Sequence, residues 1–400
     1  MSDAAAARDL LLEMVAGPRP DVEGRMRRLD AQDWEWIGAV AAEHRLGPLL
    51  ASRFADSPTP PPELVAVWTE DQLRSVRRWL KQRKLLHELS SLLGARGLRH
   101  LALKGAWLAL GAYPSGATRP LRDLDLLVDD VPAASQALHD AGFRRLAKYT
   151  EPGPTLPADL NHAIGFKSPG DGTLVELHHR VDADWRGASL AAAEMLERAA
   201  TVQLPAGPLH FPAPEDNFLH LVAHAALHHR FDNGPLLLSD LACLCEAAPL
   251  DWRVVQERAA SAGLSRAVGL VLQLLHDLSG KPPRGMPTAA FPAPPSWATT
   301  QAKDLLVQRH DQRWRRRTAA DSARRDGVLD RTMFVLQRTA PKRRALSEIS
   351  GRAIEDPRIW LSTPAWYMDR GRKFIVAQLH AESRRTAEAD ARVDRWLTGG

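Results

Sequence analysis

The stretch LALKGAWLALGAYPSGATRPLRDLDLLV, residues 101–128, ends with two acids inside an apolar run. In a β-strand alternate side chains share a face, so we expect Asp123 and Asp125 to point the same way. Two adjacent carboxylates repel each other, and a cation between them relieves that repulsion. Such pairs also occur on solvated strand faces, but carboxylate oxygens are the ligands that Mg²⁺ prefers, together with substrate phosphates. The pair therefore predicts a magnesium site on a strand.

The features before this acidic pair follow a specific order. A short apolar strand breaks at Lys104-Gly105, a short helix and a Gly/Pro-rich turn follow, and Arg119 comes just before the acids. This order resembles the polymerase-β-like nucleotidyltransferase superfamily, in which a glycine turn after the first strand holds a nucleoside triphosphate (NTP) and the next strand carries two metal-binding acids. The motifs Leu-Lys-Gly-Ala, Tyr-Pro, Arg and Asp-x-Asp-Leu-Leu-Val resemble more closely a bacterial branch of nucleotidyltransferase family proteins, often found beside natural-product genes. The resemblance covers residues 30 to 275 and is looser outside these motifs.

The resemblance implies an α+β fold, with a small mixed β-sheet core flanked by N- and C-terminal helical regions. It implies that Asp123 and Asp125 bind two Mg²⁺ ions, or Mn²⁺, and that a third carboxylate on a neighbouring strand completes the set. Glu176 is our candidate, because the related branch has an acid followed by Leu-His there, usually Asp; the alternative is an exposed acid on a hairpin. Asp182 and Asp184 form another acidic pair, but their surroundings predict a loop, which holds a ligand less rigidly than a strand.

Three further residues are expected to contact the nucleotide. Lys104 would provide a point charge for the β- or γ-phosphate, and the backbone at Gly105 would approach closely because no Cβ intrudes. The wider superfamily generally has Gly-Ser at this turn, whereas Ala106 follows the glycine here, so a hydroxyl contact to phosphate is missing. Arg119 is expected either to reach the triphosphate or to pair with Asp123.

A second group of polar residues lies further along the chain, and comprises His220, His224, His228 and His229 with Asp232 and Asp240. The first three histidines recur every four residues, so they share one face of a helix. Histidines at this spacing can bind zinc, but the sequence lacks the Glu of the protease signature and the adjacent His-Asp of phosphohydrolases. The alternatives are that they pack against the core or line the acceptor pocket.

The composition is that of a soluble globular protein, with 400 residues, 44 % apolar and 25 % charged. A net charge of +5 suits an anionic substrate but does not require a nucleic acid. Cys243 and Cys245 are two residues apart on an expected helix, so they predict neither a disulfide nor a zinc pair and are typical of a reducing cytoplasm. The N-terminus lacks a basic region and no apolar run is long enough for a bilayer, so we expect neither a secretory signal nor a membrane partner.

The length predicts two or three packed units, and composition shifts divide them further. The expected regions are an N-terminal helical region (1–96), a nucleotidyltransferase core (97–205), a helical domain (206–281), a Pro-rich linker (282–295) and a basic C-terminal helical region (296–400).

Apolar periodicity and turn residues predict the elements within these regions. The expected elements are helices over 63–93 and 132–142, strands over 143–148, 162–167 and 174–178, and helices between 214 and 278. Basic side chains on the first helix are expected on a solvated face, although contact with phosphate is the alternative. Arginine-rich patches at 313–317 and 342–344 have the same two interpretations, a solvated face or RNA binding.

Together these patterns favour a metal-dependent nucleotidyltransferase that moves an NMP group from an NTP to a small-molecule or peptide acceptor. The alternatives are an RNA-directed, tRNA-modifying or toxin-like transferase, a non-catalytic nucleotide-binding protein, and a hydrolase working from the histidine face. Because paired carboxylates repel each other, replacing either Asp123 or Asp125 by Asn is expected to leave the stability of the metal-free protein unchanged or slightly higher. The sequence does not determine the base, the acceptor or the oligomeric state.

Overall fold

The computed structural model describes residues 4–17, 19–146, 163–181, 189–287, 290–323, 327, 330, 346, 356–364 and 381–399. The chain divides into two compact units, residues 1–307 and 308–400. The helix α13 (Ser296–Leu306), which the sequence analysis grouped with the C-terminal region, packs against α1 and α12 inside the first unit.

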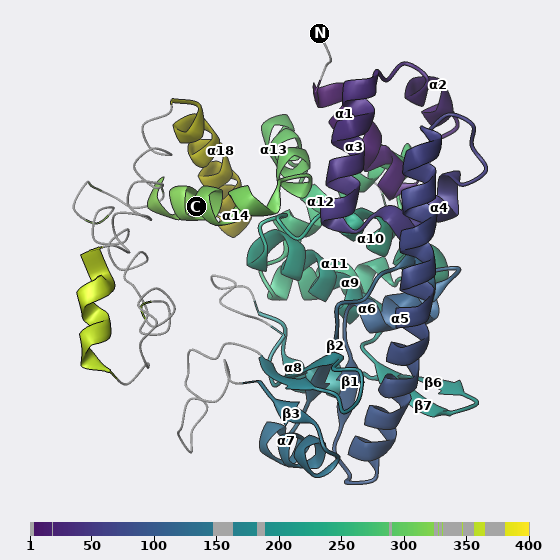
Figure 1. Cartoon of the computed structure of the whole chain (residues 1–400), viewed down its shortest axis with the longest axis vertical. Coiled ribbons are helices and arrows are strands. Elements are labelled where there is room, and N and C mark those ends of the chain that lie inside the picture. Colours follow the sequence, from purple (N-terminus) through teal and green to yellow (C-terminus); the bar gives the residue numbers. More distant parts are fainter. Residues whose placement is uncertain are drawn as a thin grey trace. The chain divides into compact units, whose positions relative to one another are not determined.

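The first unit opens with helices that lead to its sheet. They are α1 (Ala4–Ala16), α2 (Val22–Met26), α3 (Ala31–His44), α4 (Gly47–Phe54) and α5 (Pro62–Gly94). The long helix expected over 63–93 is confirmed as α5, which begins with proline, a residue suited to the first helical turn. This helix extends from α4 to the sheet and contacts both (Figure 1).

The sheet of the first unit has five strands in the order β1-β2-β5-β4-β3. Their bounds are β1 His100–Ala102, β2 Asp123–Val128, β3 Arg144–Arg145, β4 Ala163–Lys167 and β5 Leu174–His178. Strands β2 and β5 pair in parallel, and the other pairs are antiparallel. The predicted α+β class with a small mixed sheet is therefore confirmed. The strand expected over 143–148 is β3, which is two residues long; Phe143 and Leu146 on either side are described and are not part of it, and residues 147 and 148 lie outside the described part.

A separate hairpin follows the sheet and was not predicted. It comprises β6 (Ala200–Leu204) and β7 (Gly207–Phe211). These strands straddle the boundary expected at 205/206 between the core and the helical domain, whose helices are expected from residue 214. Gly207 has a positive φ of 118° in the turn, a conformation that glycine adopts without steric cost. The hairpin packs through β7 against α5 and β1.

The remaining elements of the first unit are helical, as the sequence analysis predicted for 132–142 and 214–278. They are α7 (Val131–Asp140), α8 (Ala192–Glu197), α9 (Pro214–Ala223), α10 (Leu236–Ala247), α11 (Trp252–Ser261) and α12 (Ser265–Ser279). Two π-helical turns, η1 (Leu108–Ala112) and η4 (His224–His228), interrupt this regular structure, and a short helix α6 (Gly105–Trp107) precedes η1. Such turns are rare and often mark functional positions.

The second unit contains α14 (His310–Ala323), η5 (Pro357–Ser362) and α18 (Ala381–Thr398), and α14 packs along α18. Arg316 of α14 forms a two-pronged ion pair with buried Asp390 of α18, with N–O distances of 2.9 and 3.1 Å. The basic patch at 342–344 lies outside the described residues. In the described part of the chain, no helix combines the length and the apolar character needed to cross a membrane.

Candidate active site

The site is built on the neighbouring parallel strands β2 and β5. Asp125 lies directly opposite Glu176 in the register, so both side chains project from the same face of the sheet. His178, two residues after Glu176, shares that face. Ligand atoms of these three side chains all lie within 4.8 Å of one another, which makes them a group able to hold a metal ion. Asp125 and His178 are buried, and Glu176 is half-buried.

Two neighbouring side chains hold the carboxylate of Asp125 in place. Its Oδ1 accepts a hydrogen bond of 2.7 Å from Nε2 of His178 and an ion-paired hydrogen bond of 3.1 Å from Nζ of Lys104. Burial alone would favour its protonated form, but Lys104 and His178 outweigh burial and hold the pKa of Asp125 well below its usual range. Asp125 is therefore a carboxylate at neutral pH.

Asp123 differs from its neighbour although both are on β2. Burial, and then the charge of Asp125, raise the pKa of Asp123 to about 6. In the described conformation Asp123 is not part of the group of three ligands. The two acids are equivalent in the sequence pattern, whereas their surroundings shift their pKa values in opposite directions.

The backbone of Lys104 has an unusual conformation at the turn between β1 and α6. Its φ of 49° and ψ of −119° lie where residues with a Cβ are rarely found. Such a conformation costs on the order of 1–3 kcal/mol and persists where surrounding structure imposes it, often at functional sites. Here the side chain reaches Asp125 and is mostly shielded from solvent.

Gly105 is required for packing as well as for its position in the turn. A Cβ on this residue would lie 2.5 Å from a methyl carbon of Leu121 and 2.8 Å from Nη1 of Arg119. Any larger residue would displace one of these side chains. The expected approach of the Gly105 backbone to a phosphate remains a prediction.

Arg119 pairs with Asp240, not with Asp123. Its Nε and Nη2 donate to the two carboxylate oxygens at 3.0 and 2.7 Å, and Nη1 donates to the carbonyl of Pro120. The buried hydroxyl of Tyr113 donates to the same carboxylate at 2.7 Å. This network joins the segment before β2 to α10, so Arg119 holds the turn in place; its expected contact with triphosphate remains a proposal.

The histidine face lies next to the acidic group. The charge of Lys104 acts on both His220 and His224, and those of His178 and Asp125 act on His220. Burial, followed by Lys104, lowers the pKa of His220 to about 3 and that of His224 well below its usual value. Both rings are therefore neutral at physiological pH.

The histidine rings are close to each other because of the π-helical turn η4. His224 stacks on His228 with ring centroids 5.3 Å apart, and both contact the ring of His229 edge-on. Within the described residues, the group suited to a metal ion is the one on β2 and β5 and includes none of these rings. The geometry thus favours lining of the site over metal binding.

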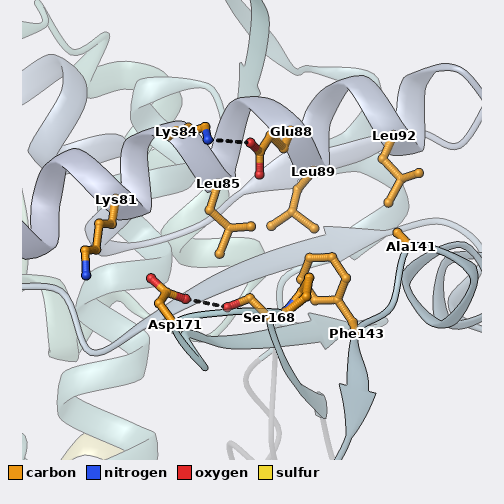
Figure 2. Close-up of a pocket in the computed structure, with 11 residues that line it drawn as sticks. Lys81, Lys84, Leu85, Glu88, Leu89, Leu92, Ala141, Phe143, Ser168 and Asp171 are labelled. Atoms are coloured by element: carbon orange, nitrogen blue, oxygen red, sulfur yellow. Dashed lines mark hydrogen bonds and ion pairs between the residues drawn. The ribbon is translucent and has the colours of Figure 1, made fainter.

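A cavity of about 470 Å³ lies elsewhere, between α5 and the turn that joins β4 to β5. Figure 2 shows Leu85 and Leu89 of α5 facing Phe143, with Lys84 paired to Glu88 at its rim. The cavity contains none of the candidate metal ligands, so it is not part of the candidate active site.

The site residues predicted from the sequence lie on β2, on β5 or in the chain leading into β2, and their roles remain predictions. They are Asp123, Asp125, Glu176, Lys104, Gly105 and Arg119. Sequence reasoning did not single out His178, although an i, i+2 spacing from Glu176 on a strand was a usable signal. Asp182 and Asp184, the competing acids, lie outside the described residues.

A mixed sheet with acids facing each other on parallel strands, beside a lysine turn, is the arrangement expected for a nucleotidyltransferase. A family model described as "uncharacterised nucleotidyltransferase" matches residues 30–280. The chain therefore belongs to this nucleotidyltransferase family.

Comparison with solved structures gives a match to an antigenic nucleotidyltransferase-like protein from Paracoccidioides brasiliensis. The two chains are 17 % identical, the match covers 49 % of this chain and 89 % of the other, and the TM-score is 0.30. A search of curated proteins found no match.

Proposed function

We propose that this protein is a metal-dependent nucleotidyltransferase, which moves an NMP group from an NTP to a small-molecule or peptide acceptor. The observation that carries the proposal is the direct opposition of Asp125 and Glu176 on parallel strands, with His178 and Lys104 beside them. Family membership supports the reaction class.

The donor set fits a divalent cation. Two carboxylates and an imidazole within 4.8 Å of one another offer three ligands from rigid strands, and Asp125 is ionised at neutral pH. A bound divalent cation would neutralise charge on the phosphoryl oxygens as the bond to pyrophosphate breaks. The charges of Asp125 and Glu176 act on Asp123, so Asp123 lies near the same group. Once its carboxyl group is deprotonated, Asp123 is the expected additional ligand for a second ion.

The protein's own groups have separate roles in this proposal. Lys104 is in reach of the carboxylate face and would move from Asp125 to a β- or γ-phosphate when a cation replaces it there. Glu176 would bind the cation or accept the proton of the acceptor hydroxyl. The neutral rings of His220 and His224 would line the acceptor side without adding charge.

The proposal is tested by incubating the protein with each α-labelled NTP, Mg²⁺ or Mn²⁺, and the products of neighbouring genes as acceptors. We expect transfer of label by the wild type and none by Asp125→Asn. His139→Ala, an exposed change on α7, is the matched control and should transfer normally. Label transfer by Asp125→Asn within a few-fold of wild type would remove the basis of the proposal.

A second candidate is a non-catalytic nucleotide-binding protein. It is favoured by Ala106, a buried residue with no hydroxyl at the position where the wider superfamily generally has serine. NTP binding without turnover under any metal would identify this function. The RNA-directed alternative relies on basic C-terminal residues, one of which, Arg316, is already paired with Asp390.

A further inference from the structure

Three arginines from separate segments meet beside the first acid of β2. Arg45 lies between α3 and α4, Arg78 lies on α5, and Arg122 immediately precedes Asp123. Their charges are close enough to act on one another: burial, and then Arg122 and Arg78, lower the pKa of Arg45, while Asp123 opposes that shift.

Packing of α5 explains why these arginines converge. The start of α4 lies against α5, so that a Cβ on Gly47 would be 2.4 Å from a carboxylate oxygen of Asp71. Further along the same helix, the side chain of Gln82 donates to the carbonyl of Leu121 at 3.5 Å. Residues 71, 78 and 82 are spaced by seven and four, so they share one face of α5. Arg78 is therefore between the segments that carry Arg45 and Arg122.

Within the described residues, none of the three arginines forms an ion pair with a carboxylate. Two nearby arginines do form ion pairs with carboxylates: Arg119 pairs with Asp240, and Arg74 pairs with Glu70 and Asp71. Asp123 supplies one nearby negative charge against the three guanidinium groups. A bound anion would relieve the repulsion that one carboxylate leaves among three like charges. This is the converse of the argument for a cation between paired acids.

The backbone of Arg45 gives an independent indication. It has φ 57° and ψ 41° in the left-handed region at the end of α3, where glycine is the usual residue. The position therefore carries a side chain at a conformational cost. That side chain is half-buried and feels the charges of Arg122 and Arg78, which are both exposed.

We propose that Arg45, Arg78 and Arg122 form a binding site for a phosphate-bearing anion beside the metal-ligand group. Guanidinium groups suit this ligand because their planar N–H pairs match phosphate oxygens. The anion is either the triphosphate of the NTP or a phosphate carried by the acceptor. The identification of the anion as the NTP triphosphate or an acceptor phosphate rests on the proposed transferase function, whereas the anion site itself does not.

The test measures binding of tripolyphosphate by calorimetry, in EDTA, to the full chain. We expect Arg78→Gln and Arg122→Gln each to weaken binding about tenfold. Arg77→Gln, an exposed change on the next residue of α5, is the matched control and should bind as the wild type does. Arg45→Gly removes the guanidinium and relieves the left-handed backbone, so it should weaken binding while leaving the melting temperature unchanged or higher.

Competition with ATP then identifies the source of the phosphate. Displacement of tripolyphosphate by ATP assigns the site to the NTP, and simultaneous binding of both assigns it to the acceptor. Asp125→Asn should keep tripolyphosphate binding even where label transfer is lost, which separates failure of this site from failure of the proposed function. Absence of binding to the wild type, unchanged binding in Arg78→Gln and Arg122→Gln, or an equal loss in Arg77→Gln would overturn the proposal.

Discussion

Nε2 of His178 lies 2.7 Å from Oδ1 of Asp125, across the parallel pair of β5 and β2, and both residues are buried. Because a carboxylate only accepts hydrogen bonds, the imidazole donates from Nε2 in this state. Lys104 donates to the same oxygen at 3.1 Å. Two donors thus occupy the position that a cation would take, and both must adjust when a metal binds.

The presence of an imidazole beside two carboxylates leads to a prediction on metal preference. Imidazole is a ligand of transition metals, so Mn²⁺ accepts it more readily than Mg²⁺, which prefers oxygen ligands alone. We therefore expect the wild type to bind Mn²⁺ more tightly than Mg²⁺, and His178→Ala to lower Mn²⁺ affinity by about 10- to 100-fold with a smaller effect on Mg²⁺. Calorimetric titration with each metal, without nucleotide, measures this difference.

His139→Ala, an exposed histidine change on α7, controls for general effects. A uniform loss of Mg²⁺ and Mn²⁺ affinity in His178→Ala would mean that His178 only orients Asp125. Unchanged affinity for both metals would exclude either role.

The two acids of β2 are predicted to respond oppositely to neutralisation, because their pKa values are shifted in opposite directions. The sequence alone predicts the same response from both. For Asp123 the folded pKa of about 6 is above its usual value, so its contribution to stability is full below the unfolded pKa and is lost as pH rises through about 6. Asp123→Asn should therefore stabilise the metal-free protein at pH 7, by up to about 2 kcal/mol, and much less at pH 4. Urea unfolding in EDTA at several pH values measures this trend.

Asp125→Asn should instead destabilise the metal-free protein by about 2–4 kcal/mol at pH 7, because Lys104 and His178 lose a buried charged partner. The depressed pKa of Asp125 means that its stabilisation is present above its unfolded pKa and is lost as pH falls toward the folded value. An equal stabilisation by both substitutions would show that mutual repulsion, not the contacts of each acid, dominates the site.

Local patterns in the sequence were sufficient for the acidic face of β2, since alternation along a strand depends only on its own residues. The register between β2 and β5 depends on a pairing across about fifty residues, which no local pattern predicts. Glu176 was chosen from the family resemblance and from the apolar run around it, which predicts a strand. Pairing of Arg119 with Asp240 joins segments 121 residues apart, so no local pattern predicts it. The hairpin β6–β7 was missed because the residues PAGP at its turn resemble a loop before a helix.

The network of Arg119, Asp240 and Tyr113 allows the two roles of Arg119 to be separated. As a positioning residue, its loss should destabilise the fold: Arg119→Lys cannot reproduce the two-pronged pair, and Asp240→Asn leaves a buried guanidinium without its counter-charge. Each change should cost about 3 kcal/mol, and the double variant should cost less than the sum, because either change alone already disrupts the two-pronged pair. Urea unfolding of the four proteins of this cycle measures the coupling.

The NTP affinity of the same variants, measured well below their melting temperatures, distinguishes a direct contact of Arg119 with the triphosphate from a positioning role. A positioning role predicts that Arg119→Lys and Asp240→Asn change NTP affinity to the same extent, since both disturb the same turn. A larger loss in Arg119→Lys alone would support the contact with triphosphate.

The role of Glu176 gives the last prediction. Glu176 is on a strand, half-buried and directly opposite Asp125, where its carboxylate is held by the pairing of β2 with β5. Glu176→Gln keeps the size of the side chain and removes its charge, so the strand pairing should persist while the ability to bind a cation or accept a proton is lost. We expect the transfer rate to fall by about 10²- to 10⁴-fold with little change in NTP affinity.

Asp182→Asn is the matched comparison, because Asp182 is the other acid that the sequence offers as third ligand. Single-turnover transfer of labelled NMP separates the chemical step from binding, and calorimetry gives NTP affinity independently. If Glu176 is the third acid, Asp182→Asn should lower the rate only slightly, and Mn²⁺ affinity should fall in Glu176→Gln alone. A large loss of rate and metal affinity in Asp182→Asn, with Glu176→Gln close to wild type, would move the third ligand to Asp182 and leave Asp125 and His178 as the metal-binding pair of the strands.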